Sequence, residues 1–162
     1  MLFAFFLIVT CYSVLTFQRN KIWKDDLTLW NDTVSKSPYK PRPYINRGMD
    51  YLNQGQLTKA LTDFSQAIEL NPGYSQAFYD RGLVYDDQGN TTQALKDYST
   101  AIEIYPSYIN ALENRAYIYY KQGEFTLALQ DYNTVINKDQ SDAQAFQNRL
   151  EDYKALVQKL EK

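Results

Sequence analysis

Apolar and small residues recur along the middle of the chain at helical spacing. Tyr44, Gly48 and Tyr51 fall at positions i, i+4 and i+7, which share one face of a helix. The same spacing recurs in a second set, formed by Ala60, Phe64 and Ala67. Gly55 lies between the two sets and is typical of a turn, whereas Pro72 follows the second set and ends it. The pattern predicts a helix–turn–helix unit whose small residues let the two helices cross closely.

This unit recurs in a 34-residue register. Seven positions keep the register: Gly48, Gly82 and Ala116; Tyr51, Tyr85 and Tyr119; Gly55, Gly89 and Gly123; Ala60, Ala94 and Ala128; Phe64, Tyr98 and Tyr132; Ala67, Ala101 and Val135; Pro72, Pro106 and Gln140. One such unit cannot bury its apolar face alone, so stacked neighbours must supply the core. We therefore predict an all-α protein with three repeats, at residues 41–74, 75–108 and 109–142.

These positions resemble the pattern of the tetratricopeptide repeat (TPR) family, which is aromatic, glycine, tyrosine, alanine, aromatic, alanine, proline. The resemblance covers Pro41 to Asp142 and implies a right-handed superhelix of antiparallel helix pairs. The third repeat departs from the pattern at Ala116, Val135 and Gln140. The glutamine replaces the proline that would end the second helix of that repeat.

Both flanks extend the register. Trp30 occupies the register position that Phe64 holds in the first repeat, so residues 19–40 are interpreted as a juxtamembrane segment and the single helix of a degenerate half-repeat. Phe146 and its neighbours continue the register forward. Residues 143–162 are therefore predicted to form a C-terminal capping helix with a solvated polar face.

The first residues predict a different element, because Leu2 to Phe17 carry no charge and the first charged side chain is Arg19. As a helix, ~18 residues rise ~27 Å, slightly less than the ~30 Å hydrocarbon core of a bilayer. Trp23 follows where an interfacial aromatic residue belongs. We predict a transmembrane helix at residues 1–18. A signal peptide, a lipoprotein leader at Cys11 and a buried helix are the alternatives.

The side of the membrane stays open. Arg19, Lys21 and Lys24 follow the apolar run, which favours a cytoplasmic repeat domain under the positive-inside tendency. Residues 1 to ~48 also resemble the junction in multi-spanning O-mannosyltransferases of the transmembrane-and-TPR type and their bacterial relatives. That resemblance implies a lumenal or periplasmic repeat domain. The non-cytoplasmic side is favoured if the chain is a fragment of a multi-pass protein, and the cytoplasmic side if it is a whole single-pass protein.

The composition argues against nucleic-acid binding, metal binding and catalysis. The net charge is −2, so no basic excess points to nucleic acid. Histidine is absent and Cys11 is the single cysteine, which removes the commonest general base and the usual soft metal ligands. No nucleophile–base pair is visible. The chain is therefore predicted not to be an enzyme and to hold no metal or cofactor.

Charged residues also keep the 34-residue register. The basic set is Arg47, Arg81, Arg115 and Arg149, and the acidic set is Asp63, Asp97 and Asp131. We interpret them as structural ion pairs, rather than as an arginine row that captures an anion. Leu29 occupies the register position where an earlier aspartate would lie, and Arg149 has no later aspartate. This favours pairing to the preceding repeat: Arg81–Asp63, Arg115–Asp97 and Arg149–Asp131. A further acidic cluster, Asp80, Asp86 and Asp87, is interpreted as a solvated or groove-facing helix end.

The family resemblance implies a protein-binding scaffold with a concave groove lined by the first helices. Mapped onto this chain, the groove residues are Arg42, Ile45, Met49, Leu52, Asn53, Gln76, Tyr79, Leu83, Asp86, Asp87, Asn110, Glu113, Tyr117, Tyr120 and Lys121. One family subset grips acidic chaperone tails with basic residues, and the matching positions here are Ile45, Met49, Asp80, Asn110 and Asn114. Without those basic residues, the groove is expected to take a peptide with apolar anchors and at least one Lys or Arg. The alternative function is the C-terminal tail of a membrane glycosyltransferase whose catalytic part is not in this chain.

Overall fold

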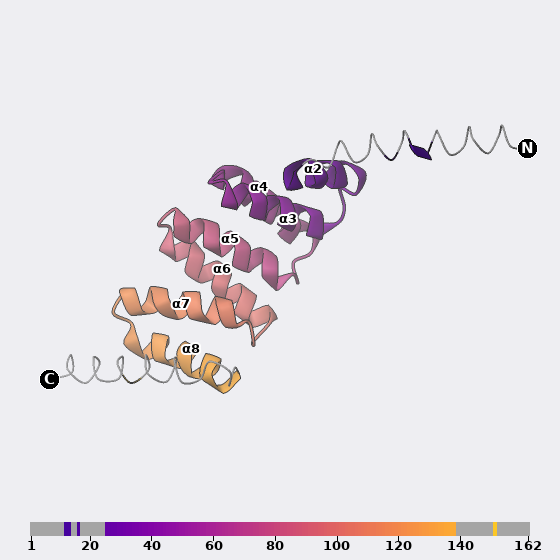
Figure 1. Cartoon of the computed structure of the whole chain (residues 1–162). Coiled ribbons are helices and arrows are strands. Elements are labelled where there is room, and N and C mark those ends of the chain that lie inside the picture. Colours follow the sequence, from indigo (N-terminus) through magenta and orange to yellow (C-terminus); the bar gives the residue numbers. More distant parts are fainter. Residues whose placement is uncertain (1–11, 14–15, 17–24, 139–150, 152–162) are drawn as a thin grey trace, which may run out of the picture.

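The computed structural model describes residues 12–13, 16, 25–138 and 151. Between residues 25 and 138 the chain is helical and contains no strand, which confirms the all-α class for this part (Figure 1). The helices are α2 (Asp26–Lys36), α3 (Pro41–Asn53), α4 (Leu57–Leu70), α5 (Ser75–Asp87), α6 (Thr91–Ile104), α7 (Ile109–Lys121) and α8 (Phe125–Lys138).

Two predicted elements lie almost wholly outside the residues that the structure describes. The predicted transmembrane helix at residues 1–18 and the predicted capping helix at 143–162 lie outside the described residues, apart from residues 12–13, 16 and 151. Within the part of the chain that the structure describes, no helix combines the length and apolarity needed to cross a membrane.

Three antiparallel hairpins follow one another along the chain. Helices α3 and α4, α5 and α6, and α7 and α8 pack as pairs, and each pair also contacts the next through α4–α5 or α6–α7. Figure 1 shows these pairs stacked in chain order. Helix α3 also contacts α5, so the first helices of the first two hairpins lie side by side.

Glycines make the turns inside the hairpins. Gly55, Gly89 and Gly123 have φ angles of 69°, 72° and 81°, a left-handed conformation that side chains with a Cβ disfavour. In the first turn the Gln56 amide donates to the Tyr51 carbonyl over 2.8 Å, which satisfies one of the carbonyls left free at the end of α3. The backbone geometry therefore explains this glycine register.

A second glycine register marks close helix crossings. A Cβ atom at Gly82 would lie 2.7 Å from Cε1 of Tyr98, and one at Gly48 would lie 2.7 Å from Cε1 of Phe64. Both rings are completely buried. In the first two hairpins the aromatic ring of the second helix thus rests on the glycine backbone of the first helix, and the third hairpin has Ala116 at this position.

The core crosses the boundaries between hairpins. Ile45, Phe64 and Ala67 of the first hairpin form one buried cluster with Ala77 and Val84 of α5. Two further clusters continue this arrangement toward α8. Stacking therefore supplies apolar burial that no single hairpin has alone.

Helix α2 packs on α3 and continues the register as a second helix. At its start, Oδ1 of Asp25 accepts a hydrogen bond of 2.8 Å from the Thr28 amide, and Oγ1 of Thr28 accepts one of 3.4 Å from the Asp25 amide. This reciprocal capping box stabilises the beginning of the helix. Residues 26–36 correspond to residues 60–70 of α4 after a shift by one repeat.

The arginine–aspartate pairs form within each repeat, so the predicted pairing to the preceding repeat is wrong. Arg81 donates from Nε and Nη2 to both carboxylate oxygens of Asp97, over 2.7 and 2.9 Å. Arg115 binds Asp131 in the same two-bond manner. The two helices of one hairpin run antiparallel around a short turn, which places each arginine opposite the aspartate of its own hairpin. Arg149 lies outside the described residues.

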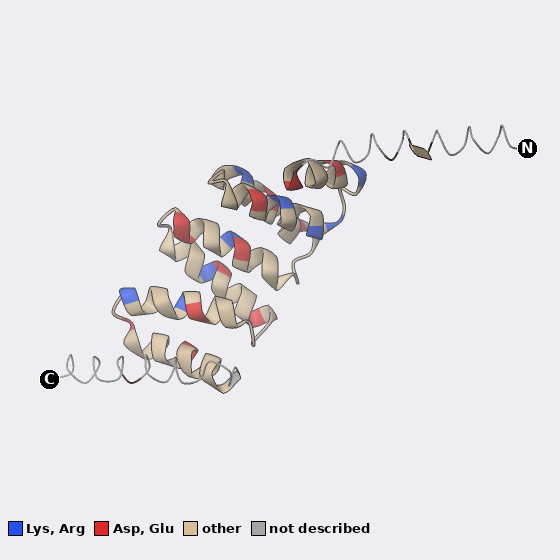
Figure 2. Ribbon diagram, in the orientation of Figure 1, with Lys and Arg blue, Asp and Glu red and all other residues tan. Residues whose placement is uncertain are grey.

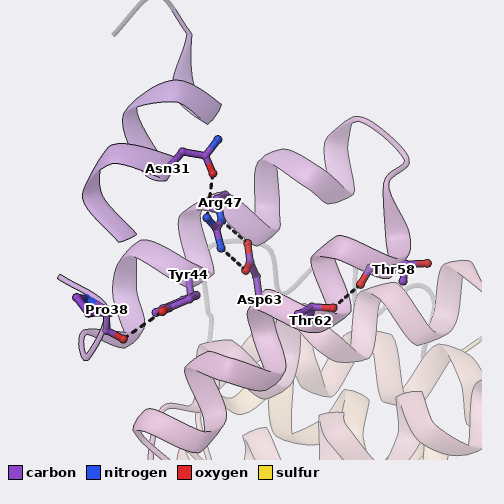
Figure 3. Close-up of polar contacts among 7 residues, drawn as sticks. All are labelled: Asn31, Pro38, Tyr44, Arg47, Thr58, Thr62 and Asp63. Carbon is purple, nitrogen blue, oxygen red and sulfur yellow. Dashed lines mark hydrogen bonds and ion pairs between the residues drawn. The ribbon is translucent and has the colours of Figure 1, made fainter. Parts of the chain in front are cut away.

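The preceding helix supplies a neutral acceptor instead. In Figure 3 the guanidinium of Arg47 lies between Asp63 and Asn31, and its Nη1 donates to Oδ1 of Asn31 over 2.9 Å. Arg81 donates likewise to Ser65, and Arg115 to Ser99. Each arginine therefore joins two helices of its own hairpin and adds one hydrogen bond to the helix before.

Candidate functional site

The predicted groove residues divide by exposure. Seven are exposed: Arg42, Asn53, Gln76, Asp87, Asn110, Tyr117 and Lys121. Met49, Leu52, Tyr79, Leu83, Asp86, Glu113 and Tyr120 are half-buried. We call the surface that the exposed residues and the half-buried side chains between them form on α3, α5 and α7 the first-helix face. Mostly polar side chains are outermost there, and apolar ones lie partly beneath them.

Two predicted groove residues do not belong to this face. Ile45 is only 1% exposed and packs in the core with Phe64 and Ala77, so it offers no surface to a partner. The ring of Tyr120 packs edge-on against Phe125, the first residue of α8, at a centroid distance of 5.7 Å. Tyr120 therefore lies toward its own second helix. The groove residues were predicted from the pattern of each repeat alone, without the next hairpin, whose helix α5 covers Ile45.

Tyr79 is the centre of an aromatic cluster between α5 and α7. Its ring centroid lies 4.9 Å from that of Tyr108 and 5.8 Å from that of Tyr98, and Tyr105 continues the row at 6.0 Å from Tyr108. Its hydroxyl oxygen accepts a hydrogen bond of 3.4 Å from Nδ2 of Asn114 on α7. We call these four tyrosines the Tyr79 cluster.

Sequence reasoning missed Tyr108. Tyr74 and Tyr108 occupy the same register position in successive repeats, each just before a first helix, so the repeat contains a signal for this position. Burial raises the pKa of both Tyr79 and Tyr108 above the usual value of 10. The two hydroxyls therefore stay neutral and can donate or accept hydrogen bonds at physiological pH.

Asp80 is not solvated, which excludes one of the two alternatives for the acidic cluster, a solvated or a groove-facing helix end. It is 3% exposed, and its Oδ2 atom is buried without a hydrogen-bond partner. Burial raises its pKa from 3.8 to about 7, and a hydrogen bond with Gln76 opposes the rise only in part. Asp86 is half-buried and Asp87 is exposed, so the three carboxyl groups have different environments.

The far end of α7 carries an exposed aromatic–cation pair. Tyr117 is 47% exposed, and Nζ of Lys121 lies 4.8 Å from the centroid of its ring. Lys121 also lowers the pKa of Asp86, which burial and Asp87 raise. Figure 2 shows that acidic and basic residues both occur on α5 and α7.

The two pockets described in the structure lie elsewhere. One, of about 450 Å³, is lined by residues 55–59 and Gln88, and the other, of about 200 Å³, by Arg47, Tyr51, Lys59, Thr62 and Asp63. No predicted groove residue lines either pocket. Among the described residues, no three His, Cys, Asp or Glu side chains come together in a way that could hold a metal ion.

The repeat geometry and the sequence register agree with one family. The tetratricopeptide repeat profile matches residues 45–109 and 79–146. The chain belongs to the tetratricopeptide repeat family. No curated protein matches the chain.

Solved structures share this fold at low sequence identity. A structure of MamA is 24% identical with a TM-score of 0.66, over 73% of this chain and 69% of that one. A TPR protein of Thermus thermophilus is 21% identical with a TM-score of 0.67, over 78% and 70%. The first TPR domain of Spaghetti (RPAP3), bound to the HSP90 peptide SRMEEVD, is 19% identical with a TM-score of 0.66, over 73% and 95%. Identities at this level establish the fold alone.

Proposed function

We propose that this TPR chain is a protein-interaction scaffold that binds a peptide segment of another protein across the first-helix face. The Tyr79 cluster carries the proposal, because it joins α5 to α7 close to polar side chains that are free to contact a ligand. Tyrosine is favoured as an anchor at interfaces, since it combines a large apolar ring with a polar hydroxyl. The similar RPAP3 domain binds a peptide, which supports this mode of recognition.

The chemistry of the face favours a different ligand from that of RPAP3. The peptide SRMEEVD carries two adjacent glutamates. In this chain the four acids Asp80, Asp86, Asp87 and Glu113 lie on α5 and α7, and they outnumber the two cations of the face, Arg42 on α3 and Lys121 at the end of α7. Like charges across an interface suppress binding, so a peptide with apolar anchors and at least one Lys or Arg fits this face better than an acidic one.

The test compares tyrosine variants on a displayed library of short random peptides. Wild-type protein is expected to enrich a defined apolar motif, and Tyr79→Ala/Tyr117→Ala is expected to lose it. Tyr39→Ala is the matched control, because Tyr39 is exposed and lies in the connection before α3. Circular dichroism of each variant checks that it is folded. A folded double variant that enriches the same motif as wild type would show that the first-helix face is not the binding site.

We also propose that residues 1–18 tether the scaffold to a membrane, a proposal that the uncharged run from Leu2 to Phe17 supports. The full chain should stay with membranes through high-salt and alkaline washes, and deletion of residues 1–24 should release it. Release of the intact chain by salt alone would contradict the tether.

The alternative, a glycosyltransferase tail, rests on the resemblance of the junction at residues 1 to ~48. The reading frame upstream of Met1 tests this alternative. Further apolar spans in frame favour the tail, whereas a ribosome-binding site and a stop codon favour an independent scaffold.

A further inference from the structure

Four aspartates are buried in the described part of the chain, and one of them lacks a cation. Asp63, Asp97 and Asp131 each accept two hydrogen bonds from an arginine of the same hairpin. Asp80 is buried to a similar degree, yet its Oδ2 has no hydrogen-bond partner. A buried carboxylate is normally paired, because the loss of hydration is otherwise uncompensated. Asp80 therefore has unused capacity to accept hydrogen bonds from a cation.

The position of Asp80 points this capacity toward the first-helix face. Gln76 lies one turn earlier on α5, is exposed, and shares a hydrogen bond with Asp80. Ala77 and Val84 of the same helix are fully buried against the first hairpin, so the core encloses the other side. Gln76 therefore connects the Asp80 carboxyl group to the exposed surface of α5.

Two tyrosines lie within electrostatic range of the same carboxyl group. The charge of Asp80 contributes to the raised pKa of Tyr79 and of Tyr108. Aromatic faces attract ammonium and guanidinium groups. This chain forms such a contact at the far end of α7, between Lys121 and Tyr117. A carboxylate beside tyrosine rings is a combination that suits a cationic side chain.

We propose that Asp80 binds a Lys or Arg side chain of the peptide that occupies the first-helix face. This inference rests on the proposed function and adds the residue that selects the charge of the ligand. The ammonium or guanidinium group donates hydrogen bonds to Oδ2 and replaces the hydration that burial removes. Binding of the cation also favours the ionised carboxylate, so the fourth buried aspartate acquires what the other three obtain from arginine.

The experiment uses the full chain in detergent and two matched peptide libraries. Both libraries are acetylated and amidated and have random flanks, and they differ only at a central residue, which is lysine in one and its neutral analogue norleucine in the other. Wild-type protein should prefer lysine by about tenfold, as expected for a hydrogen bond between charged groups. Asp80→Asn should reduce this preference to less than about twofold and keep the selection of apolar flanks.

Glu103→Gln is the matched control, because Glu103 is an exposed acid on α6, outside the first-helix face, and the change removes the same charge. It should keep the lysine preference. If Asp87→Asn, which removes an exposed acid of the face itself, reduces the preference as much as Asp80→Asn does, the overall acidity of the face selects the cation and the inference is wrong. If wild type selects apolar flanks that depend on Tyr79 and Tyr117 but accepts norleucine as well as lysine, the inference fails and the proposed function stands. If wild type selects no peptide at all, both fail.

Discussion

Replacement of Arg81 by methionine tests the pairing that the sequence alone did not predict. Methionine keeps an unbranched apolar side chain but removes all donors of the guanidinium. Asp97, whose side chain is 3% exposed, then loses both of its charged hydrogen bonds. Removal of one partner of a buried pair costs about 3–5 kcal/mol, because it leaves an uncompensated charge. Arg81 is itself about one-fifth exposed, which favours the lower end of that range.

A double-mutant cycle separates this pairing from the alternative. Arg81→Met and Asp97→Asn should each destabilise the protein, and together they should destabilise it by about 1–3 kcal/mol less than the sum of the two. The cycle of Arg81→Met with Asp63→Asn is the control. Its coupling energy should lie within about 0.5 kcal/mol of zero, because Asp63 is bound by Arg47 instead.

Urea unfolding followed by circular dichroism measures both cycles, since urea does not screen charges as guanidinium salts do. A strong coupling of Arg81 with Asp63, together with additive effects of Arg81 and Asp97, would refute the pairing within the repeat. Equal coupling energies in the two cycles would also refute the arrangement in the structure. There each arginine binds a charged partner in its own hairpin and a neutral partner in the preceding helix.

Three further predictions follow from packing and burial. Gly82→Ala should lower the melting temperature, because overpacking against the Tyr98 ring costs about 1–3 kcal/mol and exceeds the gain of about 1 kcal/mol in helix propensity; Gly73→Ala, where a Cβ meets only an ordinary contact of 3.4 Å, should change it little. Ala94→Leu should also overpack the core, by about 1–3 kcal/mol, and an unchanged melting temperature would contradict the fully buried position of Ala94. Burial raises the pKa of Asp80 from 3.8 to about 7. The contribution of its protonated form to stability is therefore complete below pH ~4 and is lost as the pH rises through ~7, a loss of up to about 4 kcal/mol. Asp80→Asn should abolish this loss, as measured by unfolding at several pH values.

The hairpins were predictable because their determinants are local. The φ angle of 69° at Gly55 explains why a glycine stands at this turn, and the same position recurs at Gly89 and Gly123. The contact of Gly48 with Phe64 joins the two helices of one hairpin across a short turn. The same two register positions hold a small and an aromatic residue in all three repeats. Such short-range constraints appear directly in the register of the sequence.

The ion-pair partners were not predictable in the same way. Arg81 lies between Asp63 and Asp97 in the sequence and almost midway, so the 34-residue register is compatible with both pairings. Which of the two aspartates binds Arg81 depends on how far the turn between α5 and α6 displaces the two helices along each other. That displacement is a property of the folded hairpin. The sequence prediction relied instead on Leu29 and Arg149, the register positions at the two ends where a partner is missing, and they favoured the wrong pairing.

The candidate site was predictable only in part, because burial in a stacked array depends on the next repeat. Ile45 was assigned to the groove from the family pattern, yet it is buried in one cluster with Phe64 of its own second helix and with Ala77 and Val84 of α5. Asp80 likewise reads as one member of an acidic run, and only the packing of Ala77 and Val84 beside it shows how far it is removed from water.

The two kinds of arginine contact have a consequence for binding. Within each hairpin the guanidinium binds a buried carboxylate, whereas between hairpins it reaches only a neutral oxygen, such as Ser65 or Ser99. Hydrogen bonds between charged groups are roughly twice as strong as those to neutral groups, so these contacts hold a hairpin together more firmly than they hold neighbouring hairpins. At the joint between α5 and α7, Tyr79 and Asn114 supply a further link. A peptide that spans this joint would add contacts where the polar links are weakest, so its binding should stabilise the stacking of the repeats as well as the complex.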